Sequence, residues 1–431
     1  MNRTFKSIER KGRKYNILAL PNTNFFKFEI INKYGSNIER IYEERTGKNV
    51  YGIAHFVEHL GFRATKDYTT EELLRELKNE GTYNASTNYD RINYWFQTDM
   101  TRTQKAINLV CNYALNDLSK IPQDEFEIER KVVFNEAKRY ADDDQTMFYF
   151  DIDKSLCGFH DEDNVIGIPE TIDTFTLEDA TAIKDIFLNN GSNIFNITYD
   201  PTILTQDEVI TMIEIEMSRF TPLNISEAVT QEQYNASLKA PKNITAKVEN
   251  ESEQHMTWIN LDVVDNHITA NYANSFIASM SPENSLNDLI REKNGLTYGV
   301  HFSTTLSSYK PYTYFACDVS KGTEDKLMEL FNESINKVAD SWNSETFEKF
   351  MDAKKLKRSM SLLDQKNYGS WHNTATWYPH IIEDLEEILA SDLDAAYIAM
   401  EEKYTSEAQI REYLVNIKNV VNSKDFGLVT N

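Results

Sequence analysis

The run His55-Phe56-Val57-Glu58-His59 places two imidazoles and a carboxylate at helical spacing. On a helix, His55 and His59 lie at i and i+4 on one face, and Glu58 lies on the adjacent flank. All three side chains can reach one metal ion, with the carboxylate as a base beside it. The alternative is two surface histidines and an ordinary helix charge. The combination favours a metal site.

A helix is expected here because apolar residues recur at i, i+3, i+4 and i+7. They are Val50, Ile53, Ala54 and Val57. This stripe can pack on a sheet, with the histidines beside it. Two protein ligands are too few for a zinc site, which usually takes three and leaves a fourth position for water. A third ligand must come from elsewhere.

A second helix is predicted over residues 126–140, with Phe126, Val133, Ala137 and Tyr140 as its core stripe. Glu129 and Glu136 fall on the same stripe. A carboxylate that faces a core is costly unless it is paired or binds a metal. Metal binding by one glutamate and support by the other would explain both. They could instead be exposed glutamates bridged to Arg130 or Lys131.

The chain resembles the zinc metallopeptidases of the pitrilysin and insulinase family, the inverzincins, whose signature is H-x-x-E-H. Further landmarks lie at residues 35–39, 52–54 and 84–87, so the likeness covers nearly the whole chain. It is similar to the short two-domain branch with the mitochondrial processing peptidase beta subunit and bacterial homologues. The resemblance implies that His55, His59 and Glu136 bind one Zn²⁺ per chain. It makes Glu58 the catalytic base and Glu129 an acid that supports the ligands.

The segment 286–300 predicts a helix that ends at Gly295, followed by a strand from Thr297. Arg291 and Tyr298 flank this turn. By itself, a capped helix before a strand tyrosine is ordinary. The family carries an R-E-x-x-G-L-x-Y pattern in its second half. The resemblance therefore implies that Arg291 and Tyr298 hold the substrate backbone and stabilise the developing oxyanion, for which a guanidinium and a phenol are suitable donors.

Residues 82–87 and 92–96 read as two strands joined by a polar turn. An exposed edge at Asn84 and Ala85 could accept a peptide as an added strand, through main-chain hydrogen bonds that do not depend on sequence. A plain structural hairpin is the alternative.

A faint internal repeat indicates two similar α+β domains, each a mainly antiparallel sheet packed with helices. An aromatic strand, a helix and a polar turn before phenylalanine occur at 94–126 and again at 314–347. We expect a zinc-binding domain at 1–220, a linker at 221–250 and a second domain at 251–431. The second half lacks H-x-x-E-H and should supply substrate contacts.

Composition excludes several classes of protein. Three cysteines, Cys111, Cys157 and Cys317, lack C-x-x-C spacing and favour a reducing compartment, so we expect a cytoplasmic protein. There is no apolar run long enough for a membrane span. The 14 glycines form no nucleotide-binding motif. A net charge of −23 opposes nucleic-acid binding; it serves solubility or attracts basic peptides.

The resemblance implies a zinc-dependent endopeptidase that hydrolyses short or unfolded polypeptides in an enclosed chamber. It also implies a homodimer with shared active sites, since a chain of this length is half of the four-domain enzymes. One alternative is a catalytically inactive relative acting as a structural or peptide-binding subunit. Another is an acidic protein-binding scaffold, which leaves Glu129 and Glu136 without an explanation.

Overall fold

The computed structural model describes most of the chain and divides it into two compact units. The first comprises residues 1–143, 160–238 and 368–396, and the second comprises 144–159, 239–367 and 397–431. The described residues are 2–143, 146–147, 150, 164–189, 193–220, 244–249, 253–260, 266–280, 283–305, 312–361, 370–423 and 427–429. Cys157 therefore lies outside them.

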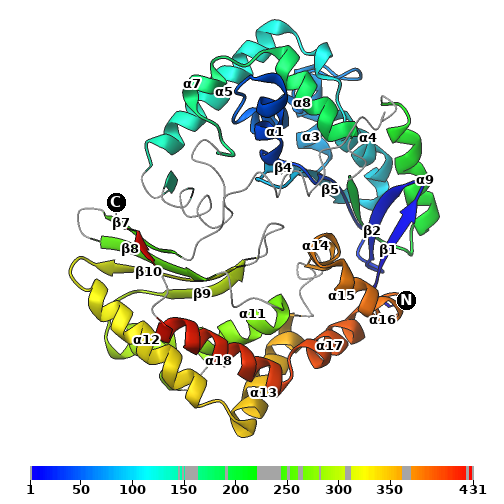
Figure 1. Cartoon of the computed structure of the whole chain (residues 1–431). Coiled ribbons are helices and arrows are strands. Elements are labelled where there is room, and N and C mark those ends of the chain that lie inside the picture. Colours follow the sequence, from blue (N-terminus) through cyan, green and yellow to red (C-terminus); the bar gives the residue numbers. More distant parts are fainter. Residues whose placement is uncertain are drawn as a thin grey trace. The chain divides into compact units, whose positions relative to one another are not determined.

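The first unit holds a sheet and the helices around it (Figure 1). Its elements are β1 (Thr4–Arg10), β2 (Arg13–Ala19), β3 (Phe25–Asn32), α1 (Asn37–Thr46), α2 (Ile53–Leu60), α3 (Thr70–Glu80), β4 (Thr82–Thr87), β5 (Ile92–Asp99), η1 (Met100–Arg102), α4 (Thr103–Ala114), η2 (Leu118–Lys120), α5 (Gln123–Ala141), α7 (Pro169–Ile172), α8 (Leu177–Asn189), β6 (Ile194–Tyr199), α9 (Gln206–Met217), α14 (Ser370–Trp377), α15 (Pro379–Asp384) and α16 (Glu386–Leu389).

The first sheet has the strand order β1-β2-β6-β3-β5-β4. Only the β2–β6 pairing in this sheet is parallel. One face is apolar and is covered by α2 and α4. On that face Phe28 lies opposite Phe96, and both are fully buried. Strand β4 forms an edge of the sheet and contacts α2, so the edge strand and the helix that carries the histidine motif are neighbours.

The opposite face of this sheet carries a polar ladder that crosses all six strands. Side-chain hydrogen bonds join one residue of each strand to the next, in the order Ser7, Asn16, Asn196, Glu29, Asn93 and Ser86. The strand register brings these side chains next to one another, because Asn16 is paired with Asn196 and Asn196 with Glu29. The ladder thus links all six strands through their side chains, in addition to the main-chain pairing.

Helix α14 covers part of the ladder face, although the sequence had placed its residues in the second domain. Its Trp371 and His372 contact the ring of Phe5 on β1, and His372 contacts the main chain of Ile197 on β6. Trp371 is 1% exposed. Residues 368–396, grouped by sequence with the second domain, therefore pack with the first unit, because its sheet buries their apolar side chains.

The second unit repeats the same architecture with a smaller sheet. Its elements are β7 (Ile244–Glu249), β8 (Glu253–Asn260), α11 (His267–Ser275), η3 (Phe276–Met280), η4 (Asn287–Lys293), β9 (Val300–Thr305), β10 (Tyr312–Ser320), α12 (Glu324–Asp340), α13 (Ser344–Ser361), α18 (Glu407–Ser423) and β11 (Gly427–Val429), while α17 (Leu393–Tyr404) begins in the first unit. Most of the linker expected at 221–250 lies outside the described residues, and its 244–249 portion forms β7.

The two sheets share a motif that reflects the internal repeat. Strands β3, β5 and β4 lie side by side in the first sheet, as β8, β10 and β9 do in the second, whose order is β11-β7-β8-β10-β9. In each unit the hairpin leads into a long helix, α4 or α12. The predicted fold class is confirmed: α+β, with two similar units and mainly antiparallel sheets.

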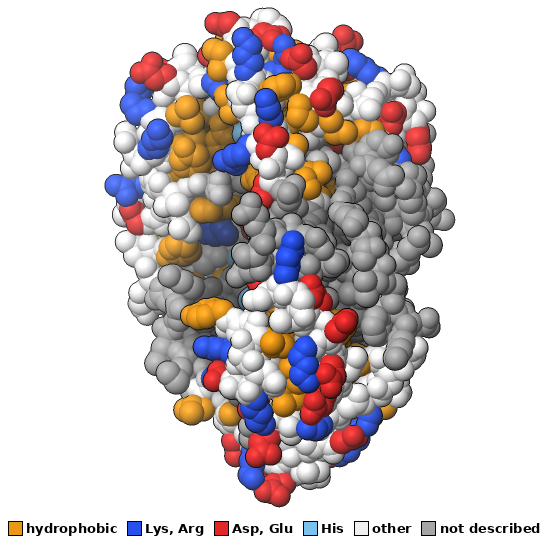
Figure 2. All heavy atoms as spheres, turned by 90° about the vertical axis from the view of Figure 1, so that its left-hand side faces the viewer, with side chains coloured by type: hydrophobic (Ala, Val, Ile, Leu, Met, Phe, Trp, Pro, Cys, Tyr) orange, Lys and Arg blue, Asp and Glu red, His pale blue; other side chains and the backbone are white. Residues whose placement is uncertain are grey.

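The surface carries charges of both signs. On the face in Figure 2, acidic and basic side chains are interspersed, so the acidic excess is not gathered there into a single patch. Among the described residues, no helix combines the length and apolar content needed to cross a bilayer.

Candidate metal centre

The structure brings His55, His59 and Glu136 together. One ligand atom from each lies within 4.8 Å of the others. The Nε2 atoms of His55 and His59 are 3.9 and 3.5 Å from Oε2 of Glu136. Both histidines come from α2, whereas Glu136 comes from α5, which packs beside it. Two imidazoles and one carboxylate form a ligand set that suits zinc and leaves room for water.

The start of α2 is fixed by a buried carboxylate. Glu39 of α1, 1% exposed, accepts hydrogen bonds from the main-chain N–H groups of Gly52 and Ala54. These are N–H groups that a helix start leaves without helical partners, and the helix dipole favours an anion there. Gly52 has φ +95°, and a Cβ on it would lie 2.3 Å from Gly167. Glycine at both positions allows the 164–168 loop to pack against this end.

Glu129 orients one of the histidines. Its Oε1 accepts a hydrogen bond from Nδ1 of His59 at 2.7 Å, and its other oxygen binds Arg63. With Nδ1 as the donor, Nε2 of a neutral His59 keeps its lone pair toward Glu136. Glu129 is 6% exposed, and Phe126, Val133 and Ala137 on the same helix are also buried. Three of the four predicted core residues are therefore buried together with Glu129, whereas Tyr140 and Glu136 are half-buried.

Burial keeps the histidines neutral. It lowers the pKa of His55 to about 3, with a further contribution from neighbouring His59 that the Ile166 carbonyl only partly offsets. Burial also lowers the pKa of His59, although Glu58 and Glu136 act in the opposite direction. The two rings lie 4.6 Å apart and nearly perpendicular. Neutral imidazoles are the form that binds metals.

Glu58 lies beside the cluster and is 8% exposed. Its Oε2 accepts a 2.6 Å hydrogen bond from the hydroxyl of Thr87 on β4. Burial raises the pKa of Glu58, and the Thr87 hydrogen bond opposes that rise. A carboxylate with a raised pKa, held close to a metal site, is chemically suited to accept a proton from water.

Asn84 and Ala85 lie on the edge strand β4, as the sequence indicated. Their side chains point to opposite faces: Asn84 is exposed, whereas Ala85 is 8% exposed on the face packed by helices. Thr87 shares the inward face with Ala85, which is why its hydroxyl reaches Glu58. The free edge of β4 thus lies next to the metal cluster.

Arg291 and Tyr298 lie in the second unit and contact each other. The guanidinium carbon of Arg291 is 5.3 Å from the centre of the Tyr298 ring, a cation–π contact. Tyr298 is 91% exposed. The predicted αL residue at the end of the helix is present, since Gly295 has φ +61°. The following strand begins at Val300 rather than at Thr297.

Three residues around the site were not assigned a role from sequence. Thr87 and Glu39 belonged to recognised landmarks, and the alternation of β4 could have shown that Thr87 faces inward with Ala85. Arg63 had no signal, because its pairing with Glu129 depends on the crossing of α2 and α5.

Comparisons with known proteins place the chain in a family. Residues 42–155 match the model described as Insulinase (Peptidase family M16). Residues 204–353 match the model described as Peptidase M16 inactive domain. The chain belongs to peptidase family M16. The first match includes the motif helix α2 and Glu136, and the second lies largely in the half without the motif.

Relatives of this M16 family member extend over most of its length. An uncharacterized zinc protease of Rickettsia felis is 23% identical over 352 residues, which cover 80% of each chain. The crystal structure of a protease from Helicobacter pylori superposes with a TM-score of 0.71 at 17% identity, covering 99% of this chain and 98% of that one. Pitrilysin superposes with a TM-score of 0.63 at 16% identity, covering 96% of this chain but 44% of that one.

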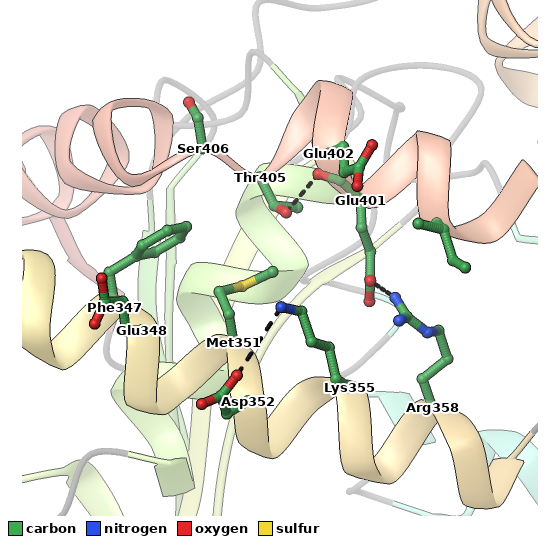
Figure 3. Close-up of a pocket in the computed structure, with 11 residues that line it drawn as sticks. Phe347, Glu348, Met351, Asp352, Lys355, Arg358, Glu401, Glu402, Thr405 and Ser406 are labelled. Carbon is green, nitrogen blue, oxygen red and sulfur yellow. Dashed lines mark hydrogen bonds and ion pairs between the residues drawn. The ribbon is translucent and has the colours of Figure 1, made fainter. Parts of the chain in front are cut away.

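This M16 family member also has a pocket of about 430 Å³ in the second unit, lined by none of the candidate site residues named from the sequence. Helices α13 and α17 form its walls (Figure 3). Phe347 and Met351 contribute its apolar part. Two of its acidic residues are paired with lining cations: Arg358 binds buried Glu401, and Lys355 lies 3.9 Å from Asp352. Glu348 and Glu402 also line it, so the lining has four acidic and two basic residues.

Proposed function

We propose that the chain is a zinc-dependent endopeptidase. The observation that carries the proposal is the convergence of His55, His59 and Glu136, with Glu58 buried beside them. In addition, the Glu129 carboxylate is hydrogen-bonded to Nδ1 of His59 and orients its ring. Such a supporting acid is expected at a metal site and is not expected for a chance grouping of these side chains. The family membership and the zinc-protease name of the Rickettsia relative support the same function.

The residues fit zinc by their chemistry. In this proposal His55, His59 and Glu136 hold one Zn²⁺ per chain. The bound ion would supply Lewis acidity and lower the pKa of a water to roughly 7. Glu58 accepts the proton from the attacking water and later delivers it to the leaving amine, without a covalent intermediate. The hydroxyl of Thr87 holds Glu58 in place during both steps.

The substrate is proposed to be a short or unfolded polypeptide. The free edge of β4 at Asn84 and Ala85 would bind its main chain as an added strand, next to the cluster. Arg291 would hold a substrate carbonyl, and the exposed phenol of Tyr298 would donate to the oxygen that becomes negative. An enclosed chamber would exclude folded proteins.

We further propose a homodimer in which each zinc site receives Arg291 and Tyr298 from the partner subunit. The proposal is supported by the superposition on pitrilysin, in which this chain covers 44% of the pitrilysin chain. A two-fold pair of chains would supply the remaining half. A cytoplasmic location stays a prediction from the cysteine content.

A catalytically inactive relative is the alternative, and the inactive-domain match at residues 204–353 is the observation that favours it. That match lies outside α2 and α5. It therefore does not bear on the residues that carry the proposal.

The deciding experiment compares Glu58→Gln with His59→Ala for bound zinc and for hydrolysis of a quenched peptide. Glu58→Gln should keep zinc and retain less than about one per cent of wild-type turnover, because an amide cannot accept the proton. His59→Ala should lose both. A wild-type protein that binds zinc and cleaves no member of a diverse peptide set would favour the inactive relative.

A further inference from the structure

We infer that Asp288 and Lys293 are positioning residues: their ion pair holds η4 in a π-helical form and thereby sets the place of Arg291 beside the loop 295–299. The inference rests on the proposed function, because it explains how the chain presents the arginine assigned to a substrate carbonyl. Both residues lie in the second unit. Neither has a proposed contact with substrate, so they would act only through Arg291.

The helix that carries Arg291 is a π-helix. It runs over the seven residues Asn287–Lys293, and its main-chain hydrogen bonds join residues five apart rather than four. Such helices are rare and are frequent at functional sites. A helix with more residues per turn rotates less at each residue, so an α-helix of the same residues would present Arg291 on another side of its axis. The π form therefore determines where the guanidinium lies.

Two side-chain contacts match the five-residue spacing. Nζ of Lys293 lies 2.7 Å from Oδ2 of Asp288, and Nδ2 of Asn294 donates a 2.7 Å hydrogen bond to the carbonyl of Leu289. On an α-helix with 3.6 residues per turn, side chains five apart would lie roughly 140° from each other around the axis, too far for a short ion pair. The ion pair therefore fits the π form and would be lost in the α form.

Asp288 is itself anchored at the start of the helix. Its Oδ2 also accepts a 2.7 Å hydrogen bond from the main-chain N–H of Asn284. The carbonyl of Asn284 in turn accepts a 2.6 Å hydrogen bond from Ser334 on α12. Lys293 and the Asn284 N–H hold the pKa of Asp288 below its usual value, so the carboxyl is charged. The ion pair thus ties the last residue of η4 to a point that is fixed on α12.

The end of η4 is joined to the loop that carries Tyr298. The N–H groups of Gly295 and Leu296 donate to the carbonyls of Arg291 and Ile290, at 2.9 and 3.0 Å. These bonds close over four and six residues, each one residue wider than when an α-helix ends on a left-handed glycine in the Schellman motif. A change of η4 to the α form would break this closure and move Arg291 away from its 5.3 Å contact with the Tyr298 ring.

The first test needs no activity. Lys293→Met keeps the apolar stem and removes the charge, so the unit should fold while the π-helix loses its ion pair. Hydrogen exchange measured by mass spectrometry should become about two- to fivefold faster over residues 287–296, as expected for the loss of one partly exposed ion pair. Lys293→Arg keeps the cation and should exchange like wild type.

The matched control is Lys326→Met. Lys326 forms a 2.8 Å ion pair with Glu329 on α12, and its side chain is 47% exposed, against 49% for Lys293. The variant makes the same change of net charge in the same unit. It should leave hydrogen exchange over residues 287–296 as it is in wild type.

The second test asks whether the ion pair acts through Arg291. Its readout is the affinity of a labelled peptide for Glu58→Gln protein, measured by fluorescence anisotropy. Lys293→Met should weaken binding about threefold in this background, and Arg291→Ala should weaken it further. Adding Lys293→Met to Arg291→Ala should then have no additional effect, because the guanidinium that the ion pair positions is gone. A structural role alone would give the same loss in both backgrounds.

Unchanged exchange over residues 287–296 in Lys293→Met, or an equal effect of Lys326→Met, would overturn the inference. Additive losses of peptide affinity from Lys293→Met and Arg291→Ala would overturn it as well. If wild type cleaves no peptide and Glu58→Gln protein binds none, the proposed function fails separately. The exchange measurement then still decides whether the ion pair holds the π form.

Discussion

The hydroxyl of Thr87 donates a 2.6 Å hydrogen bond to Oε2 of Glu58, so the edge strand β4 and the motif helix α2 are joined at the proposed catalytic base. The strand that would bind the substrate main chain thus also holds the group that acts on it. The substrate-binding edge and the proposed base are therefore linked through this one hydrogen bond.

Thr87→Val should lower kcat by about tenfold or more, because a hydrogen bond to a charged group is lost while the shape is kept. Bound zinc, measured by atomic absorption, should not change. Thr87→Ser keeps the donor and should recover most of the rate. A serine variant as slow as the valine variant would indicate that packing, not the hydrogen bond, matters.

Glu129→Gln should weaken zinc binding by about 10- to 100-fold, because the amide is a poorer acceptor for Nδ1–H of His59. Competition with a chelator of known affinity measures this. Asp124→Asn, at an exposed position in the first turn of the same helix, is the control and should bind zinc like wild type. Equal affinities for all three proteins would remove Glu129 from the site.

Glu39→Gln should destabilise the first unit by about 1–3 kcal/mol, because a buried anion that accepts two helix N–H groups is replaced by an amide. Urea unfolding measures the change. Glu44→Gln, on an exposed position of α1, should have little effect. A loss in Glu44→Gln as large as in Glu39→Gln would argue against the role of the N-terminal contact.

Stability should fall between about pH 6.5 and pH 4 because of His372. Burial lowers its pKa from 6.5 to about 4, with Glu29 acting to raise it and Lys27 to lower it. Above pH 6.5 the ring is neutral in both states. Below that value the unfolded chain binds a proton that the folded chain does not, so up to about 3 kcal/mol is lost by pH 4 and no more below.

His372→Gln should flatten this part of the pH profile, measured by denaturant unfolding from pH 8 to pH 4. His380→Gln serves as the control, since His380 is exposed on α15. A slope unaltered by the His372 change would assign the pH dependence to other groups.

The shared site of the proposed homodimer can be tested by complementation. Glu58→Gln and Tyr298→Phe proteins should each be inactive. Mixed under conditions of subunit exchange, they should recover about a quarter of wild-type activity if the site is shared, because half of the dimers are mixed and each has one intact site. Exchange shown by light scattering of tagged subunits, without recovery, would contradict the shared arrangement.

The two histidines could be anticipated because their spacing is local and follows the 3.6-residue period. The apolar stripe of α5 pointed to Glu129 and Glu136, but the role of Glu136 as the third ligand was implied by the family resemblance. The hairpin of β4 and β5 was also predictable from alternation.

Other contacts depend on tertiary packing that one sequence does not contain. Arg63 reaches Glu129 only because α2 crosses α5, and residues 368–396 return to the first unit after a long excursion of the chain. The strand β7 could not be predicted, because its segment is polar and has no strand pattern of its own. It forms a strand because it pairs with β8 and β11 on its two sides.

The polar ladder of the first sheet has a direction. From Ser7 through Asn16 and Asn196, and from Ser86 through Asn93, every donor points toward Glu29. Burial alone would raise the pKa of Glu29, but Lys27 and the amides keep it lowered. One anion therefore sets the orientation of every amide in the series. If Glu29 were neutralised, the amides could reverse, and the reversal would reach Ser86 on the edge strand.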